Sequence, residues 1–145
     1  MSYVEDSTKR LRTEVGRALG PGLELFAINQ SPTARERLSR WVRVLVNTVT
    51  ASYASIGPRE TRLRRAIGNV TVQIFTLVKD GDLASLQLAD RLISKLDGEE
   101  YAEEGFKIRL NLPFVSFSGA DAANEKLWFQ TNVTIPYSID YTTTD

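Results

Sequence analysis

The chain has 145 residues and a mass of 16.2 kDa, a size that predicts a single domain over residues 1–145 with one hydrophobic core. Its composition, 42% hydrophobic and 25% charged, is close to the globular average and argues against disorder, a collagen-like chain or a coiled coil. Apolar runs such as Val44-Leu45-Val46 are far shorter than the ~20 residues that cross a bilayer. We therefore expect a soluble protein that has no membrane partner.

The charge balance and two missing residue types exclude several function classes. Eighteen basic residues offset eighteen acidic ones, whereas a general nucleic-acid binder is strongly basic. The sequence has no Cys and no His, so disulfides, thiolate zinc sites and the commonest general base are ruled out. The first residues lack a charged leader followed by an apolar stretch, so we expect no secretory signal. Most hydrolase mechanisms are therefore closed to this chain, and we expect no cofactor or metal.

The first part of the chain predicts a helix and a short strand. Residues 3–19 place Val4, Leu11, Val15 and Leu19 at helical spacing. The sequence Gly20-Pro21-Gly22 ends this helix, because Gly accepts the left-handed cap and Pro cannot continue the hydrogen bonding. Residues 23–28 alternate weakly and predict a strand.

Two strands and a second helix follow. Residues 41–50 and 69–78 are rich in β-branched side chains that alternate between two faces. The loop between them carries Gly57-Pro58 and a basic run. Residues 83–96 repeat Leu, Ile and Ala at intervals of three and four after the N-cap residue Asp82, so they predict an amphipathic helix.

The C-terminal third predicts an acidic loop and more strands. Four glutamates between positions 99 and 104 predict a solvated loop. Alternation then predicts a strand from residue 106 through 112, with Pro113 as a break before residues 114–117, and a last strand from about residue 126 to 137. Pro136 has no amide hydrogen, so we place the end of the last strand at a sheet edge or a bulge.

The order of these elements defines the fold class. Helices that are separate from a run of mostly antiparallel strands are typical of an α+β domain. We predict a mostly antiparallel β-sheet of about five strands with two amphipathic α-helices packed on it.

Three candidate chemical sites have simpler explanations. Asp80, Asp82 and Asp90 lack the spacing of a calcium loop and are better explained as turn, cap and helix-surface residues. In the acidic stretch, nothing fixes two carboxylates at a catalytic separation. The glycines at positions 16, 20 and 22 end a helix, whereas a dinucleotide fingerprint opens one.

The two parts of the chain carry opposite charge. Residues 1–65 contain twelve basic and six acidic residues, and residues 66–145 contain six and twelve. A solvated surface that happens to be segregated would explain this pattern. Alternatively, the basic residues meet an acidic patch on a neighbouring copy, and head-to-tail contact of unlike patches builds a ring. The candidate residues for such an interface, or for a lumen, are Arg35, Arg37, Arg40, Arg59, Arg62, Arg64, Arg65, Glu99, Glu100, Glu103 and Glu104.

Several short motifs, taken in order, resemble a known family. They are Ser2-Tyr3-Val4 in the first helix, Trp41-Val42-Arg43-Val44, Gly68-Asn69-Val70-Thr71-Val72-Gln73-Ile74-Phe75, Gly81-Asp82, Leu88-Ala89-Asp90-Arg91-Leu92, and the final strand from Trp128 through Thr131-Asn132-Val133 to Tyr137. Their order and spacing resemble those of the lambda-type tail-terminator proteins of long-tailed bacteriophages and a related phage domain family of unknown function. The resemblance covers nearly the whole chain.

The resemblance implies a structural protein of the virion that is not an enzyme and is assembled in the host cytoplasm. Such a protein forms a homo-hexameric ring, caps the tail tube at its head-proximal end and offers its other face to a head-completion or neck protein. Partners would be further copies of itself, the tail tube protein and the neck protein. Arginines that line the lumen would contact passing DNA weakly.

Other functions stay open at this point. A tail tube subunit or a head-to-tail adaptor shares the same size and fold class. A small enzyme that uses only carboxylates or Ser/Thr would need a cleft with perturbed pKa values. A ligand-binding module would need a large apolar pocket.

Overall fold

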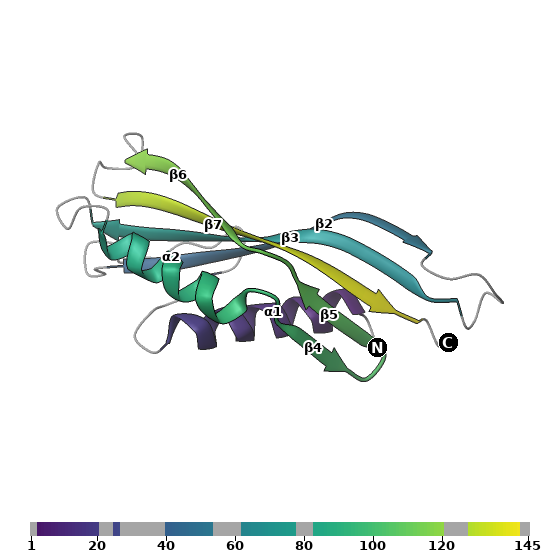
Figure 1. Cartoon of the computed structure of the whole chain (residues 1–145). Helices are drawn as coiled ribbons and strands as arrows, with labels where there is room; N and C mark the ends of the chain where they lie inside the picture. Colours follow the sequence, from purple (N-terminus) through teal and green to yellow (C-terminus); the bar gives the residue numbers. More distant parts are fainter. Residues whose placement is uncertain are drawn as a thin grey trace.

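The computed structural model describes residues 3–20, 25–26, 40–53, 62–77, 83–120 and 128–142. Figure 1 shows how the helices and strands of this part are arranged. The helices are α1 (Tyr3–Leu19) and α2 (Leu83–Leu96). The strands are β1 (Leu25–Phe26), β2 (Arg40–Tyr53), β3 (Arg64–Leu77), β4 (Glu100–Glu103), β5 (Phe106–Leu110), β6 (Phe114–Ala120) and β7 (Trp128–Tyr141).

Both helices occupy the residues that apolar spacing predicts. In α1, Leu11, Val15 and Leu19 are buried, and the amide of Gly20 donates a hydrogen bond to the carbonyl of Gly16 at 3.0 Å. Gly20 has φ +85°, the left-handed conformation that closes a helix at little cost only for glycine. The described helices are too short or too polar to cross a membrane.

The described strands form a single sheet in the order β1-β2-β3-β7-β5-β4, with β6 also paired to β7. β1 runs parallel to β2, and the other neighbours are antiparallel. The predicted α+β class is therefore confirmed, with seven strands where the sequence predicts about five.

The strands β2 and β3 are longer than predicted. β2 continues to Tyr53 and β3 already begins at Arg64, so the basic residues at positions 64 and 65 belong to a strand and not to a loop. Cross-strand pairing continues through Ala51 opposite Ala66, beyond an irregularity at positions 48–50. Hydrogen bonding to a partner holds these residues extended although their own apolar alternation is weak.

Pro136 lies inside β7, so the prediction that it ends the last strand is wrong. β5 pairs with Tyr137–Tyr141 and β6 pairs with the first part of β7, and Pro136 faces the junction between them. Its carbonyl accepts a hydrogen bond from the amide of Asn111 at 2.8 Å. Because the N–H and C=O of one residue point to the same side in an antiparallel sheet, the missing N–H falls at this break.

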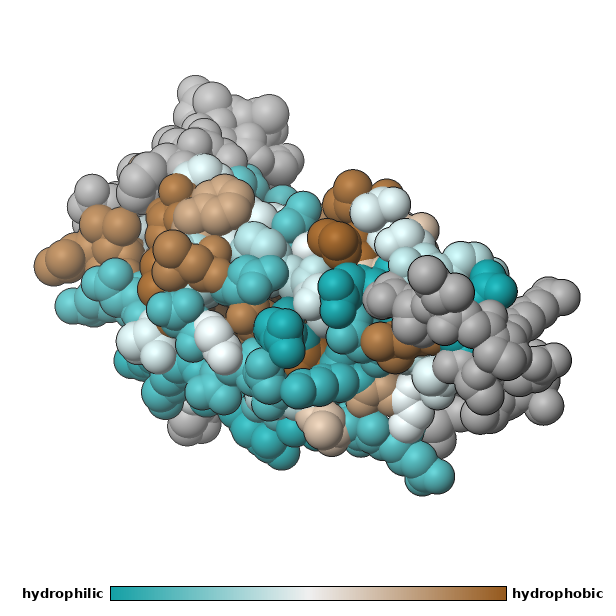
Figure 2. All heavy atoms as spheres, turned by 45° about the vertical axis from the view of Figure 1, so that its right-hand side comes forward, coloured by the Kyte–Doolittle hydropathy of each residue, from teal (hydrophilic) through white to brown (hydrophobic). Residues whose placement is uncertain are grey.

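The two helices cover one face of the sheet, and the core lies between these layers (Figure 1). Side chains such as Val44, Val72 and Val133 occupy one cross-strand row of that face and are fully buried. The opposite face carries polar side chains, among them Arg43, whose guanidinium donates to Gln73 at 3.3 Å. Figure 2 shows one side of the molecule, where hydrophilic residues lie between several separate groups of hydrophobic residues.

Candidate assembly interface

One cross-strand row at the end of the sheet brings the basic and the acidic candidates to the same height. The row runs from Tyr53 in β2 through Arg64, Tyr141 and Phe106 to Glu103 in β4. We call this part of the sheet the Tyr141 end. Four strand spacings of ~4.8 Å place its two edges roughly 19 Å apart. The basic and acidic candidates in the described part thus lie toward opposite edges.

The basic edge is built around an exposed tyrosine. The guanidinium carbon of Arg62 lies 4.4 Å from the ring centroid of Tyr53, and that of Arg64 lies 5.5 Å from it. The Tyr53 residue is 55% exposed. A cation above an aromatic face is attracted by the negative potential of the ring. The stacking therefore concentrates two positive charges beside the last residue of β2.

Arg65 makes an ion pair inside the chain. Its Nε and Nη2 donate to the two carboxylate oxygens of Asp140 at 2.7 and 3.1 Å. These hydrogen bonds lower the pKa of Asp140 and raise the pKa of Arg65, because each charge stabilises the other. This pairing links β3 to β7.

The acidic edge is a hairpin, so the predicted solvated loop at residues 99–104 is wrong. Glu100–Glu103 form β4, and Glu104 and Gly105 make the two-residue turn to β5. Gly105 has φ +92°, which such a turn accepts readily only in glycine. Tyr101 is the one buried residue of β4, so the sequence shows no apolar and polar alternation there that would predict a strand.

Glu100 is paired across the hairpin with two cations. Its carboxylate oxygens lie 3.1 Å from Nζ of Lys107 and 2.9 Å from Nε of Arg109. Hydrogen bonds from Lys107 and Arg109 lower the pKa of Glu100. All three side chains are about half exposed, so this cluster orders the hairpin surface more than it stabilises the fold.

The helix α1 holds the hairpin in place through Arg10. Its guanidinium contacts Glu103 at 2.5 Å and Glu14 at 2.9 Å, and it lies 5.0 Å from the ring centroid of Tyr101. Burial, together with the nearby carboxylate of Glu14, raises the pKa of Tyr101 to about 12. The position of the acidic edge is thus fixed by the helix layer.

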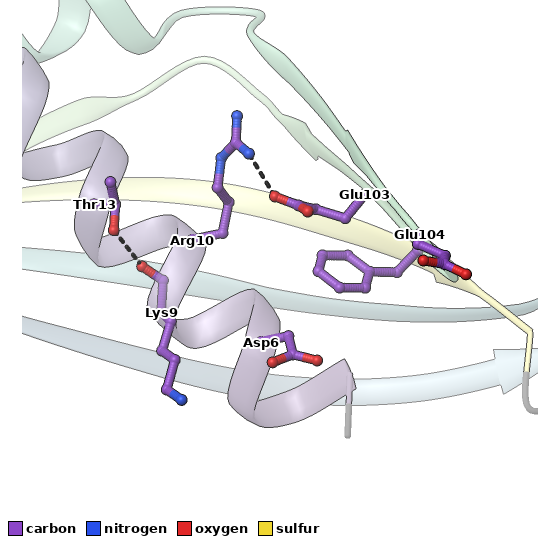
Figure 3. A pocket seen from close by; sticks show the side chains of 7 residues that line it. Asp6, Lys9, Arg10, Thr13, Glu103 and Glu104 are labelled. Atoms are coloured by element: carbon purple, nitrogen blue, oxygen red, sulfur yellow. Dashed lines mark hydrogen bonds and ion pairs between the residues drawn. The ribbon is translucent and has the colours of Figure 1, made fainter. Parts of the chain in front are cut away.

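A groove of about 380 Å³ lies between α1 and the hairpin. Figure 3 shows the Arg10 to Glu103 contact across it, with Asp6 on the α1 side and Glu104 on the hairpin side. Three acidic and two basic side chains line the groove, and Arg10 forms an ion pair with Glu103 inside it. In the described residues, no group of three or more Asp, Glu, His or Cys side chains is placed to hold a metal ion. The groove therefore suits a joint between two elements of the fold.

The other candidates are distributed as follows. Glu99 and Glu104 are exposed and form no ion pair within the described ranges. Arg40 begins β2 opposite Thr76, at the far end from Tyr53. Arg35, Arg37 and Arg59 lie outside the described residues. Arg62, Arg64 and the four glutamates lie at or near the Tyr141 end.

Sequence reasoning missed the aromatic part of this end. Tyr3 stacks on Tyr141 with ring centroids 3.8 Å apart, and Tyr53 lies under two arginines. Burial raises the pKa of Tyr141 to about 12. The only available signal was that Tyr53 continues the strand pattern beyond position 50. Arg10 and Glu14 carried a clearer signal, since opposite charges four residues apart lie on one side of a helix.

Comparisons with known proteins bear on the fold. No protein-family model matches the chain, and no curated protein matches its sequence. One solved protein structure, which bears no descriptive name, is similar to it with a TM-score of 0.58 and 16% sequence identity. The match covers 95% of this chain and 97% of the solved one. At this level of identity the likeness shows a shared fold and no more.

Proposed function

We propose that the protein is a tail-terminator subunit of a long-tailed bacteriophage or a tail-like particle. In this role it is a structural protein of the virion that caps the tail tube at its head-proximal end. It ends tube polymerisation and provides the surface to which the head or neck is joined. Its partners are other copies of itself in a ring, the tail tube protein and a head-completion or neck protein, with weak contact between arginines and DNA in the lumen.

The observation that carries this proposal is the placement of unlike charge on the two edges of one sheet end. Arg62 and Arg64 stack on Tyr53 at the β2 edge. Glu100, Glu103 and Glu104 lie in the hairpin at the β4 edge, where Glu100 and Glu103 also pair with cations of their own chain. Complementary patches on opposite sides of one subunit permit head-to-tail contact, which closes into a ring when the rotation between copies divides a full turn. The sequence resemblance to tail terminators supplies the biological setting.

A non-catalytic role fits the groups that the described part contains. The carboxylates whose pKa is lowered belong to surface ion pairs; they are Glu5, Glu100 and Asp140. The upward shifts of tyrosines follow from burial against the sheet and α1. Shifts of this kind accompany structural ion pairs and packing, and they support an assembly role over an enzymatic one.

A tail tube subunit or a head-to-tail adaptor is the second candidate. The observation in its favour is the long outer edge of β2, because uncharged strand edges promote open-ended assembly as readily as ring closure. The two candidates predict different mass distributions for the pure protein.

Light scattering of the purified protein over a range of protein and salt concentrations tests the proposal. We expect one discrete ring mass, or a monomer that reaches that mass at high concentration or on tail tubes. Electron microscopy of tubes polymerised from the tube protein of the same genome should then show the protein at tube ends only. Continuous growth into filaments would favour the tube subunit, and a monomer that ignores tubes at all concentrations would reject both.

A charge-reversal pair provides the matched control. The double substitution Arg62→Glu and Arg64→Glu should weaken ring formation, since it makes both edges acidic. Asp90→Lys reverses a charge on the exposed surface of α2 and should leave the mass distribution unchanged. Equal effects of the two changes would show that net charge, and not the edge pattern, governs association.

A further inference from the structure

The outer edge of β2 is long, and within the described residues most of it has no strand partner. β1 pairs only with Val42 and Arg43, and no strand in the described ranges pairs with the outer side of residues 44–53. These ten residues include no charged residue and no proline. Val49 is 63% exposed and Tyr53 is 55% exposed. An edge of this kind normally pairs with another strand, because its unpaired N–H and C=O groups and apolar side chains favour such pairing.

The opposite edge of the same sheet end is β4. The amide of Leu110 donates to the carbonyl of Glu99 at 2.8 Å, so Glu99, Tyr101 and Glu103 direct their backbone groups toward β5 in the alternating antiparallel pattern. The N–H and C=O groups of Glu100 and Ala102 therefore point outward. β4 thus offers a short set of backbone groups to a strand of another chain.

The two edges lie at matching heights. The row that contains Ser52 passes through Arg65, Asp140 and Lys107 to Ala102. The row two residues further along joins Thr50 to Glu100 in the same way. The four intervening pairings are antiparallel, so β2 and β4 run in the same direction. A rotation about an axis along the strands preserves height, and it would bring residues 50–53 of one copy beside β4 of the next.

We propose that residues 50–53 pair in parallel with β4 of a neighbouring copy, so that the sheet continues from one subunit to the next. Charge favours this occupant, because Arg62 and Arg64 would then lie near Glu104 of the adjoining chain, a carboxylate that forms no ion pair within the described part of its own chain. The short, acidic β4 would also explain why β2 bears no charge of its own along this edge. This inference rests on the proposed ring and specifies how its subunits are joined.

Engineered cysteines test the pairing directly, since the chain has no Cys of its own. The double variant Ser52→Cys with Ala102→Cys places thiols on one face and in one row. Within one chain the two sites are roughly 19 Å apart, and a disulfide needs Cα atoms within about 7 Å. Any disulfide must therefore join two chains. Both positions are exposed, so the substitutions should leave folding intact.

On oxidation we expect a ladder of covalent oligomers on a non-reducing gel that stops at the ring mass found by light scattering. Ser52→Cys alone and Ala102→Cys alone should give no ladder. Ser52→Cys combined with Ser116→Cys is the matched control, because Ser116 is exposed on β6 at the other end of the sheet and should give none either. A covalent dimer from Ser52→Cys alone would replace the proposed joint with two copies of β2 paired about a two-fold axis.

The outcomes separate this inference from the proposed function. A ring of discrete mass without a ladder would overturn the strand pairing and leave the terminator proposal standing. A ladder without an upper limit, together with filaments, would support the pairing and overturn the terminator. A protein that stays monomeric at all concentrations, with slow amide exchange at residues 50–53, would show that the chain covers this edge itself and would overturn the pairing.

Discussion

The hydroxyl of Tyr137 lies 3.1 Å from Oγ1 of Thr48, with one strand between them. The residue between them is Gly68 of β3, and the Tyr137 ring lies against it. A Cβ atom at position 68 would meet the Tyr137 hydroxyl at 2.6 Å and the Asn47 carbonyl oxygen at 2.1 Å. Three strands of the sheet therefore depend on the absence of one side chain.

Substitution of Gly68 should be severely destabilising. In Gly68→Ala the new methyl group must displace a buried ring and a strand backbone, and we expect a loss of about 3 kcal/mol in the free energy of unfolding. Urea denaturation followed by circular dichroism measures it. Gly98→Ala is the control, because nothing lies within 4 Å of that position. Alanine in the left-handed backbone conformation of position 98, φ +71°, should lower the free energy of unfolding by only about 1 kcal/mol. Equal losses would refute the steric argument.

The Arg65 to Asp140 pair should make stability depend on acid pH. Asp140 has a lowered pKa in the folded protein, so its contribution is present above the unfolded pKa and is lost as pH falls through the folded value. Asp140→Asn should be less stable than the parent at pH 7, by a small amount because the pair is partly exposed.

The two proteins should converge in stability as the pH is lowered toward 2. Unfolding midpoints in urea between pH 2 and 7 measure this convergence. A constant difference over the whole range would mean that Asp140 acts through packing and not through its charge.

Two buried tyrosines should make the fold sensitive to alkali. The pKa of Tyr101 and that of Tyr141 are raised to about 12, so the unfolded chain ionises first and stability falls as pH rises from about 10 toward 12. At pH 11 the ionisation of each tyrosine in the unfolded chain should lower the free energy of unfolding by about 1 kcal/mol relative to neutral pH. Absorbance of tyrosinate against pH locates the transitions. The variants Tyr101→Phe and Tyr141→Phe should each remove part of the loss, and an unchanged alkaline profile in both would contradict the burial argument.

A charge exchange should reveal contact between the two edges. Arg64→Glu alone should weaken self-association about tenfold, since like charges would then face each other across the joint. Adding Glu104→Arg in the same chain should restore part of the affinity. Sedimentation velocity at two salt concentrations measures both effects, and the difference should shrink at high salt. If the second substitution weakens association further, the two residues do not face one another.

The helices could be predicted from sequence because their signal is local. Leu88, Leu92 and Leu96 repeat at four-residue intervals and all lie in the core. The end of β2 and the start of β3 could not be predicted in the same way. The pairing of Tyr53 with Arg64 holds these residues extended, and such pairing depends on a partner distant in sequence. The order of strands in the sheet is inaccessible from alternation for the same reason.

The candidate site was predicted in part. Charge segregation indicated the two groups of residues, yet it could not show that Arg65 pairs with Asp140 or that Glu103 pairs with Arg10. These contacts join residues 75 and 93 positions apart. In the hairpin at residues 100–110, the alternation of residues 106–112 predicted β5, whereas β4 was missed. Two of the four residues of β4 are acidic, so it lacks the apolar face on which strand prediction depends.

The break opposite Pro136 offers a place to lengthen the chain. Four steps lead from Leu110 to Phe114, whereas their partners in β7, Tyr137 and Thr134, are only three steps apart. The extra residue is already accommodated outside the pairing, and Leu112 is 66% exposed. A short epitope inserted beside Leu112 would leave both registers intact. Such a tag would mark one edge of the subunit for antibody labelling in electron micrographs of whole particles.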